Sequence, residues 1–287
     1  MHSIKILTDS TADLSKDILK QKDIDVIPLH VEFIHQSYDD GITITTPELY
    51  EKVETYGELP KTAAVSPGEF MIKFSSLLKT YDDIVYIGIG SRISGTIQSA
   101  NIAKLELNNE HIHIVDSLNL SSGIALLVLK ACDLKDQGLS AKEIKKEIDL
   151  LVPLVRSQFA IKTLDYLHKG GRASGTAKLV GTLIHLKPII QVRDGILNVY
   201  KKPVGKMTRA LDVMLNDYFL EAENDNLDLT YTMITHSIAF KSATYMKDKV
   251  LEKVNPKYLI ESQAGCVISS HCGAGTIGIL YIIKKAT

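Results

Sequence analysis

The sequence predicts an α/β protein made of two parts: an N-terminal, mostly parallel α/β sandwich domain over residues 1–155 and a C-terminal α+β domain over residues 156–287. Before residue 155, short apolar runs alternate with helical patterns, which is typical of a parallel sheet covered by helices on both faces. Pro153 ends the last of these helices, and beyond it hairpin signals mix with helices. A chain of 287 residues that is 45% hydrophobic is long enough for two such domains.

Strands of the first part are predicted from apolar runs of strand length. These runs are residues 4–7, 24–28, 84–89 and 112–115. Between the second and third runs, residues 29–44 resemble a small hairpin, for which Asp40 and Gly41 supply the expected turn.

Helix starts are predicted from capping residues. Ser15 is expected to cap a helix that runs to residue 22, and Thr46 with Pro47 matches a cap followed by a first helical residue. Ser66 is followed three residues later by Glu69, which together form a capping box. Each of the strands at 84–89 and 112–115 precedes a further helical stretch.

The second part begins with a strand near residues 157–162 and a short helix that ends at two glycines. Asp194 and Gly195 lie between alternating apolar runs and give the strongest hairpin signal in the chain. Further helices are expected at residues 176–186, 207–222 and 242–254. Later strands are expected at residues 231–234 and through Leu259, Val267 and Ile279.

Ligands of open parallel sheets bind beyond the carboxyl ends of the strands. Three loops fall there, at residues 8–11, 90–96 and 115–123, and all three are rich in hydroxyl side chains. None carries the lysine of a phosphate-binding P-loop, and the protein-kinase signature is also absent, so the sequence supports no nucleotide site.

Composition excludes several classes of function. A formal net charge of -1 gives no basic field for nucleic acid, and no apolar stretch is long enough to span a bilayer. The three cysteines fit free thiols in a reducing cytoplasm, and their spacing does not suggest a metal site. The apolar start of the chain lacks a basic, signal-like segment, so we expect a cytoplasmic protein without an integral membrane segment.

Several blocks together resemble one known family. The blocks ILTDSTADLS, KTAAVSPGEF, SRISGTIQSA, VDS, KGGRAS and SSHCGAGTIG stand in the order and at about the spacing of the DegV family of bacterial fatty-acid-binding proteins. The resemblance covers nearly the whole chain. It implies two domains with one long-chain fatty acid held between them. It also implies no cofactor and no catalytic residue, because family members serve as the lipid-presenting subunit of a fatty acid kinase in phospholipid metabolism.

The resemblance also implies roles for particular residues. Thr62, Ser94, Gly95 and His271 match positions that hold the fatty-acid carboxylate, and Arg172 matches an arginine used to dock the kinase catalytic subunit. In KTAAVSPGEF, the three residues that follow Thr62 are Ala-Ala-Val, whereas Ser-Gln-Pro is common in relatives. The resemblance therefore does not predict the path of that loop.

Each of these residues also has a simpler interpretation. Ser94 could cap its own helix, whose N-terminus would suit an anion in any case. Thr62 could be an ordinary loop hydroxyl, His271 a structural histidine, and Arg172 a surface charge.

The alternative function is a serine hydrolase acting on acyl esters. Its triad would take Ser94 as nucleophile and His271 as base, with Asp116 completing the chain order Ser, Asp, His, although the G-x-S-x-G turn of such enzymes is missing.

Overall fold

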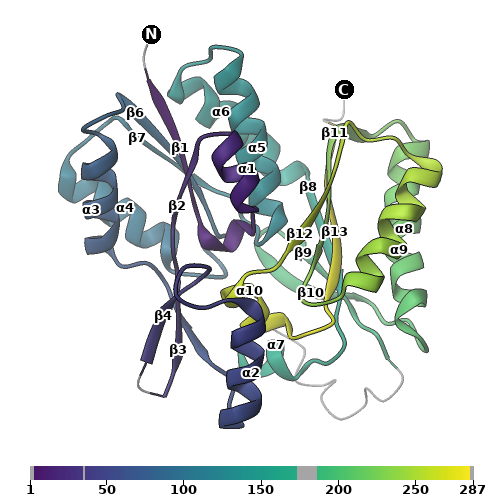
Figure 1. Ribbon diagram of the computed structural model, residues 1–287. Coiled ribbons are helices and arrows are strands. Elements are labelled where there is room, and N and C mark those ends of the chain that lie inside the picture. Colours follow the sequence, from purple (N-terminus) through teal and green to yellow (C-terminus); the bar gives the residue numbers. More distant parts are fainter. Residues whose placement is uncertain (1–2, 35, 173–185, 285–287) are drawn as a thin grey trace.

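The computed structural model describes residues 3–34, 36–172 and 186–284, and its described strands form three sheets. A four-stranded parallel sheet belongs to the N-terminal part and a six-stranded, mostly antiparallel sheet to the C-terminal part. A small three-stranded sheet extends from the first (Figure 1). This architecture confirms the predicted fold class, with a parallel α/β arrangement followed by a separate α+β region.

The parallel sheet has the strand order β2-β1-β6-β7, and every pair in it is parallel. Its strands are β1 (Ile4–Asp9), β2 (Ile24–Ile27), β6 (Asp83–Gly88) and β7 (Ile112–Asp116). These four strands confirm the four apolar runs from which strands were predicted.

Helices cover both faces of this sheet. One face carries α3 (Pro67–Leu77) and α4 (Thr96–Leu107), and the other carries α1 (Lys16–Gln21), α5 (Ser122–Asp136) and α6 (Ala141–Leu151) (Figure 1). Successive side chains of a strand point to opposite faces, so Tyr86 packs with α3 and its neighbours Val85 and Ile87 pack with α5. The predicted caps Ser15 and Ser66 are confirmed, since each side chain accepts a hydrogen bond from a backbone N–H of its helix.

The small sheet consists of β3 (His30–Phe33), β4 (Gln36–Asp39) and β5 (Lys61–Ala63), with α2 (Thr46–Tyr56) between the last two strands. The hairpin was predicted with its turn at Asp40-Gly41, and that position is wrong. The two strands meet between Phe33 and Gln36, while Gly41, with φ 72°, turns the chain from β4 toward α2.

Thr46 was also misplaced by one residue. Thr45 is the residue that caps α2, because Glu48 completes a capping box with Thr45, and Thr46 is the first helical residue.

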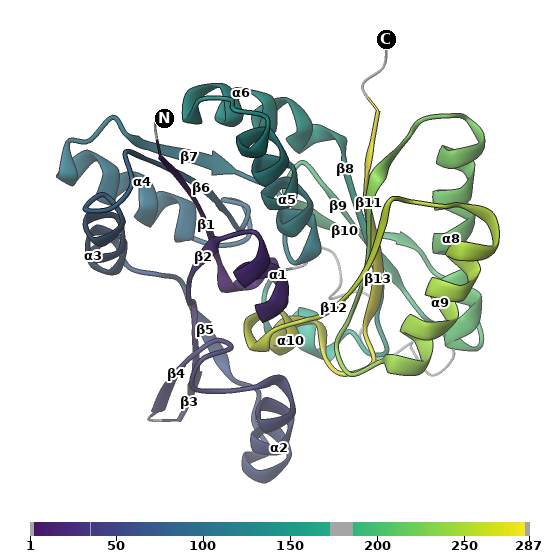
Figure 2. The same cartoon turned by 45° about the horizontal axis from the view of Figure 1, so that its top comes forward.

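The large sheet has the order β10-β9-β8-β13-β11-β12. Its strands are β8 (Val155–Ala160), β9 (Ile189–Arg193), β10 (Ile196–Lys201), β11 (Leu227–His236), β12 (Tyr258–Gln263) and β13 (Ile277–Ile283). Helices α8 (Met207–Glu223) and α9 (Phe240–Lys253) cover one face, and α5 packs on the other (Figure 2). The hairpin at Asp194-Gly195 is confirmed, with φ of 49° and 74° at the two turn residues.

Two short helices lie at one end of this sheet, α7 (Asp165–Lys169) and α10 (Cys266–Cys272). The first confirms the short helix predicted before Gly170 and Gly171. The second corrects the strand predicted through Val267, which lies in α10. The helix predicted at residues 176–186 falls, except for Leu186, outside the described residues.

The transition between the two parts follows the short 3-10 helix η2 (Val152–Leu154), and β8 begins at Val155. One buried cluster nevertheless spans both sheets: α5 packs against Val85 of the first and against Met233 and Leu280 of the second. The parts therefore share a core, and their division into two domains at residue 155 stays a prediction.

Candidate functional site

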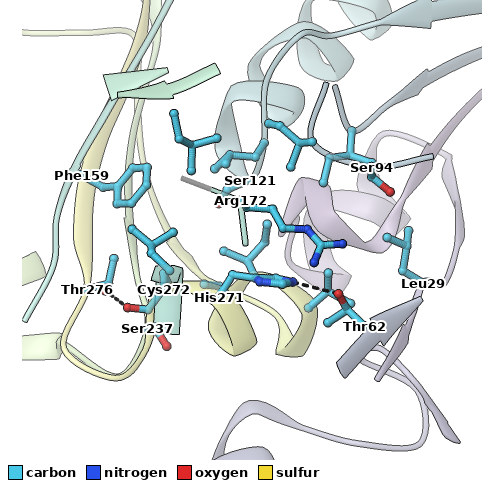
Figure 3. A pocket seen from close by; sticks show the side chains of 18 of the residues that line it. Leu29, Thr62, Ser94, Ser121, Phe159, Arg172, Ser237, His271, Cys272 and Thr276 are labelled. Carbon is cyan, nitrogen blue, oxygen red and sulfur yellow. Dashed lines mark hydrogen bonds between the residues drawn. The ribbon is translucent and has the colours of Figure 1, made fainter. Parts of the chain in front are cut away.

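A cavity of about 960 Å³, counted to its open mouth, lies between the large sheet and the loops that follow the parallel strands. Most of its lining is apolar, and Figure 3 shows part of that lining. The apolar lining residues include Leu29, Ile89, Ile93, Leu120, Phe159, Leu167, Leu197, Val267, Ile268 and Leu280.

All five residues singled out in the sequence line this one cavity: Thr62, Ser94, Gly95, Arg172 and His271. They come from β5, from the loop before α4, from the segment after α7 and from the last turn of α10. The fold thus brings together residues that are up to 209 positions apart in the chain.

Thr62 and His271 form a direct pair. The distance between Thr62 Oγ1 and His271 Nε2 is 2.8 Å, and the dashed line in Figure 3 marks this contact. The other ring nitrogen, His271 Nδ1, is buried and has no hydrogen-bond partner within the described part of the chain. It lies against Gly170, where an added Cβ would come within 2.3 Å of Nδ1, so glycine leaves the space that the imidazole occupies.

His271 is held neutral by its surroundings. Burial lowers the pKa of its imidazole to about 4, and the positive charge of Arg172 acts in the same direction. At neutral pH the ring therefore carries one proton, on either Nε2 or Nδ1.

Ser94 and Gly95 stand at the start of α4. Gly95 is the N-cap residue of that helix, and no hydrogen bond within the described residues uses its N–H. Ser94 Oγ lies 2.9 Å from Thr96 Oγ1 and accepts a long hydrogen bond of 3.4 Å from the Thr96 N–H. Ser94 thus contributes to capping while its side chain also lines the cavity, and the positive end of the helix dipole faces the same space.

Arg172 is exposed at the mouth of the cavity, where its Nη1 donates to the Gly170 carbonyl at 2.7 Å. Figure 3 shows its side chain pointing into the pocket, on the side where His271 and Thr62 lie. The resemblance implied a docking role for Arg172, and the structure also puts this residue among those that line the cavity.

The other side of the cavity is formed by the face of the large sheet. Phe159, Gly278 and Thr235 stand opposite one another on β8, β13 and β11, so they share this face. In Figure 3, Phe159 lies across the pocket from Ser94. Gly278 has no side chain, so bare backbone lies between the side chains of Phe159 and Thr235 on this face.

Asp9 and Asp116, which end β1 and β7, do not line the cavity but hold its loops. Asp9 Oδ2 accepts hydrogen bonds from the Ile89 N–H at 2.8 Å and from the Tyr86 hydroxyl at 2.9 Å. Asp116 Oδ1 accepts from the Ser91 and Leu118 N–H groups, each at 3.0 Å. Both carboxylates therefore fix the loop that carries Ser94.

The geometry does not support the hydrolase alternative. No hydrogen bond among the described residues joins Ser94 to His271, because the serine pairs with Thr96 and the histidine with Thr62. Asp116 is engaged by backbone N–H groups, so the three residues form no triad.

A family model described as "Uncharacterised protein, DegV family" matches residues 3–284. The chain belongs to the DegV family. Among its relatives, a DegV domain-containing protein of Clostridium acetobutylicum is 38% identical over 284 residues, covering 99% of this chain and 100% of the relative. Protein DegV of Bacillus subtilis is 30% identical and covers 98% and 100%.

Solved DegV structures share this fold and bind fatty acids. A Thermus thermophilus DegV family protein, described by its fatty acid binding, superposes with a TM-score of 0.91 at 28% identity, covering 98% of this chain and 100% of its own. The Bacillus subtilis DegV structure, described as a fatty acid binding protein, gives 0.86 at 27% identity, with 99% and 100% covered. A stearic acid-binding protein from Eubacterium ventriosum gives 0.84 at 25% identity, with 99% of each chain covered.

No helix within the described residues is both long and apolar enough to cross a membrane. All three cysteines are free and buried, and burial raises the pKa of the Cys272 thiol, which lines the cavity, to about 12. Across residues 3–34, 36–172 and 186–284, no three His, Cys, Asp or Glu side chains gather as metal ligands would.

Sequence reasoning missed most of the apolar lining, together with Ser121, which lines the cavity with φ 52°. Nothing in the local pattern distinguishes a lining leucine or isoleucine from a core residue, because both are buried and apolar. The hydroxyl-rich loop signal at residues 115–123 does include Ser121, and it was the only local indication of that wall.

Proposed function

We propose that this protein binds a long-chain fatty acid and presents its carboxylate to a separate ATP-dependent kinase, which forms the acyl phosphate. The carboxylate is held between the Thr62 and Ser94 hydroxyls and the Gly95 N–H, with His271 beside them. The observation that carries this proposal is one mostly apolar cavity whose lining includes Thr62, Ser94, Gly95 and His271, with Thr62 and His271 paired directly. The fatty acids bound by solved relatives support the choice of ligand.

His271 acts by orienting Thr62. When Nε2 carries the proton, it donates to Thr62 Oγ1, and the threonine proton is left free to donate to an anion. With the proton on Nδ1 instead, Thr62 would donate to the ring and turn its lone pairs toward the ligand, which would repel a carboxylate. The first arrangement is therefore the one that suits a fatty acid.

The hydrocarbon tail supplies most of the affinity. Each buried CH₂ group contributes about 0.8 kcal/mol of binding free energy, so a C16 chain gains on the order of 12 kcal/mol before the costs of binding are subtracted. A ligand of that kind stays bound through purification. Mass spectrometry of an organic extract of the purified protein is expected to find a fatty acid at about one molecule per chain, and an extract without fatty acid would refute the proposal.

Presentation to a kinase is tested separately. The sequence shows no nucleotide-binding motif, so we propose that the phosphate comes from another chain, in the cytoplasm where ATP is available. Arg172 is exposed at the cavity mouth, where a partner protein can reach it, and arginine is common at protein interfaces.

We expect acyl phosphate only when the lipid-loaded protein, ATP and a bacterial fatty acid kinase catalytic subunit are combined. Arg172→Glu should slow that reaction when parent and variant are compared at equal amounts of bound lipid. Equal rates for the variant and the parent would contradict the docking role.

A further inference from the structure

Helix α10 carries His271 in its last turn, and its first turn is held by side chains from the N-terminal part of the chain. The Gly265 N–H donates to Asp13 Oδ1 at 2.8 Å, and the Cys266 N–H donates to Asp40 Oδ1 at 2.7 Å. Thr46 Oγ1 donates to the Ala264 carbonyl at 2.8 Å. We call Asp13, Asp40 and Thr46 the α10 clamp.

The clamp is buried and bridges distant parts of the sequence. Asp13 is 7% exposed and Asp40 is 3% exposed, and their partners in α10 lie more than 220 residues away. Burial raises the pKa of both carboxyls. Because a carboxyl oxygen accepts a hydrogen bond whether or not the group is ionised, the contacts persist in either state.

Asp13 also reaches a second wall of the cavity. Its Oδ2 accepts from the hydroxyl of Ser121, the N-cap residue of α5, and its backbone carbonyl accepts from Ser262. Ser121 lines the cavity. One buried carboxyl group thus joins the start of α10 to the loop before α5.

The two ends of α10 are mechanically connected. The helix has seven residues, and five steps of about 1.5 Å separate Cys266 from His271, so a shift at the first turn moves the imidazole by a comparable amount. The pairing of His271 with Thr62, which sits on β5, depends on that position. A hydrogen bond of 2.8 Å tolerates only a few tenths of an ångström before it weakens.

We propose that the α10 clamp is a positioning device for the ligand head group: Asp40, Asp13 and Thr46 fix α10 in the place where His271 can orient the Thr62 hydroxyl toward a carboxylate. This inference rests on the proposed function. None of the three clamp side chains lines the cavity, so they act through α10 and not by touching the ligand.

The test compares two ligands with the same tail and different heads, palmitic acid and hexadecanol. A defect confined to folding or to the tail cavity weakens both ligands alike, whereas a misplaced His271 removes the advantage of the acid. The variants are Asp40→Ala, which removes the acceptor, and Asp40→Asn, which keeps it. Ser140→Ala is the matched control, because it also removes an acceptor at a helix start, that of α6, which contributes no lining residue.

In the parent protein the acid should bind more tightly than the alcohol. Asp40→Ala should reduce that preference about tenfold, as expected when a hydrogen bond to a charged group is lost. Asp40→Asn should restore most of it, and Ser140→Ala should leave it unchanged. A preference within twofold of the parent in folded Asp40→Ala, or the same reduction in Ser140→Ala, would overturn the inference.

Should Asp40→Ala fail to fold, the milder variant Thr46→Val carries the test. Valine keeps the shape of threonine and removes only the hydrogen bond to Ala264, and a reduction of about threefold is expected for a neutral hydrogen bond of the clamp. An unchanged preference there overturns the inference. If the parent binds neither palmitic acid nor hexadecanol, the proposed function fails instead.

Discussion

Replacing His271 by glutamine should remove a specific dependence of stability on pH. Burial and the charge of Arg172 lower the pKa of His271 to about 4, whereas an unfolded histidine titrates near 6.5. Between these two values the unfolded chain binds a proton that the folded chain refuses, so the contribution of His271 to stability is present above pH 6.5 and is lost as the pH falls toward 4.

The size of this effect follows from the gap between the two pKa values. At 1.36 kcal/mol per pH unit the full loss amounts to about 3 kcal/mol, of which about 2 kcal/mol falls between pH 7 and pH 5. Burial raises the pKa values of Asp9, Asp13 and Asp40, and a raised carboxyl pKa changes stability with pH in the opposite direction. For that reason the difference between parent and variant is the informative quantity, since the aspartates cancel in it.

The assay is urea unfolding of delipidated parent and His271→Gln at pH 7, 6 and 5. Glutamine stays uncharged throughout and can still place a donor near Thr62. We expect the stability of the parent, relative to the variant, to fall by about 2 kcal/mol from pH 7 to pH 5. Curves that stay parallel across this range, or a His271 proton resonance that titrates near pH 6.5, would refute the account of the buried neutral imidazole.

Three further predictions concern the site and the core. Thr62→Ala combined with Ser94→Ala should weaken palmitate binding by about 100-fold, because two hydrogen bonds to a charged group are lost, and isothermal titration of delipidated protein measures this directly. Gly170→Ala should weaken binding with little change in secondary structure, because the added methyl group would displace the His271 ring; an unaltered affinity would contradict the close contact. Phe74→Ala should lower the free energy of unfolding by about 3–5 kcal/mol in urea, since this ring is fully buried between α3 and the parallel sheet.

The sequence predicts the fold well wherever local patterns decide the structure. The four parallel strands are short apolar runs, the cap at Ser66 is a local capping box, and the hairpin at Asp194-Gly195 depends on two adjacent residues. The hairpin turn after His30 was misplaced because Asp40-Gly41 has the composition of a hairpin turn, yet Asp40 bonds back to Leu29 and across to α10. The local sequence does predict a turn at these two residues, but the long-range contacts of Asp40 determine which elements that turn connects.

In the candidate site, too, some residues are indicated by local sequence and others only by long-range contacts. The composition of the loop at residues 90–96 indicates a binding site, because glycines and hydroxyl side chains follow a buried strand. Thr62 and His271 carry no such signal, since a threonine in a three-residue strand and a histidine in a seven-residue helix look ordinary in isolation. Only the resemblance to the DegV family singled them out from the sequence, and only the fold brings them within 2.8 Å of each other.

Helix α10 was wrongly predicted as a strand, and the same helix carries the site residue His271. The sequence suggested a strand through Val267, because seven residues make only two turns and a buried apolar residue fits either structure. A longer helix would have revealed its start by a local cap, but the residue before α10 is Gly265, whose lack of a side chain leaves the first N–H groups without a local acceptor. Asp13 and Asp40 supply those acceptors from the far end of the chain. An element whose ends are both fixed by distant residues cannot be predicted from its own sequence, and the same dependence lets it join the two parts of the protein around one cavity.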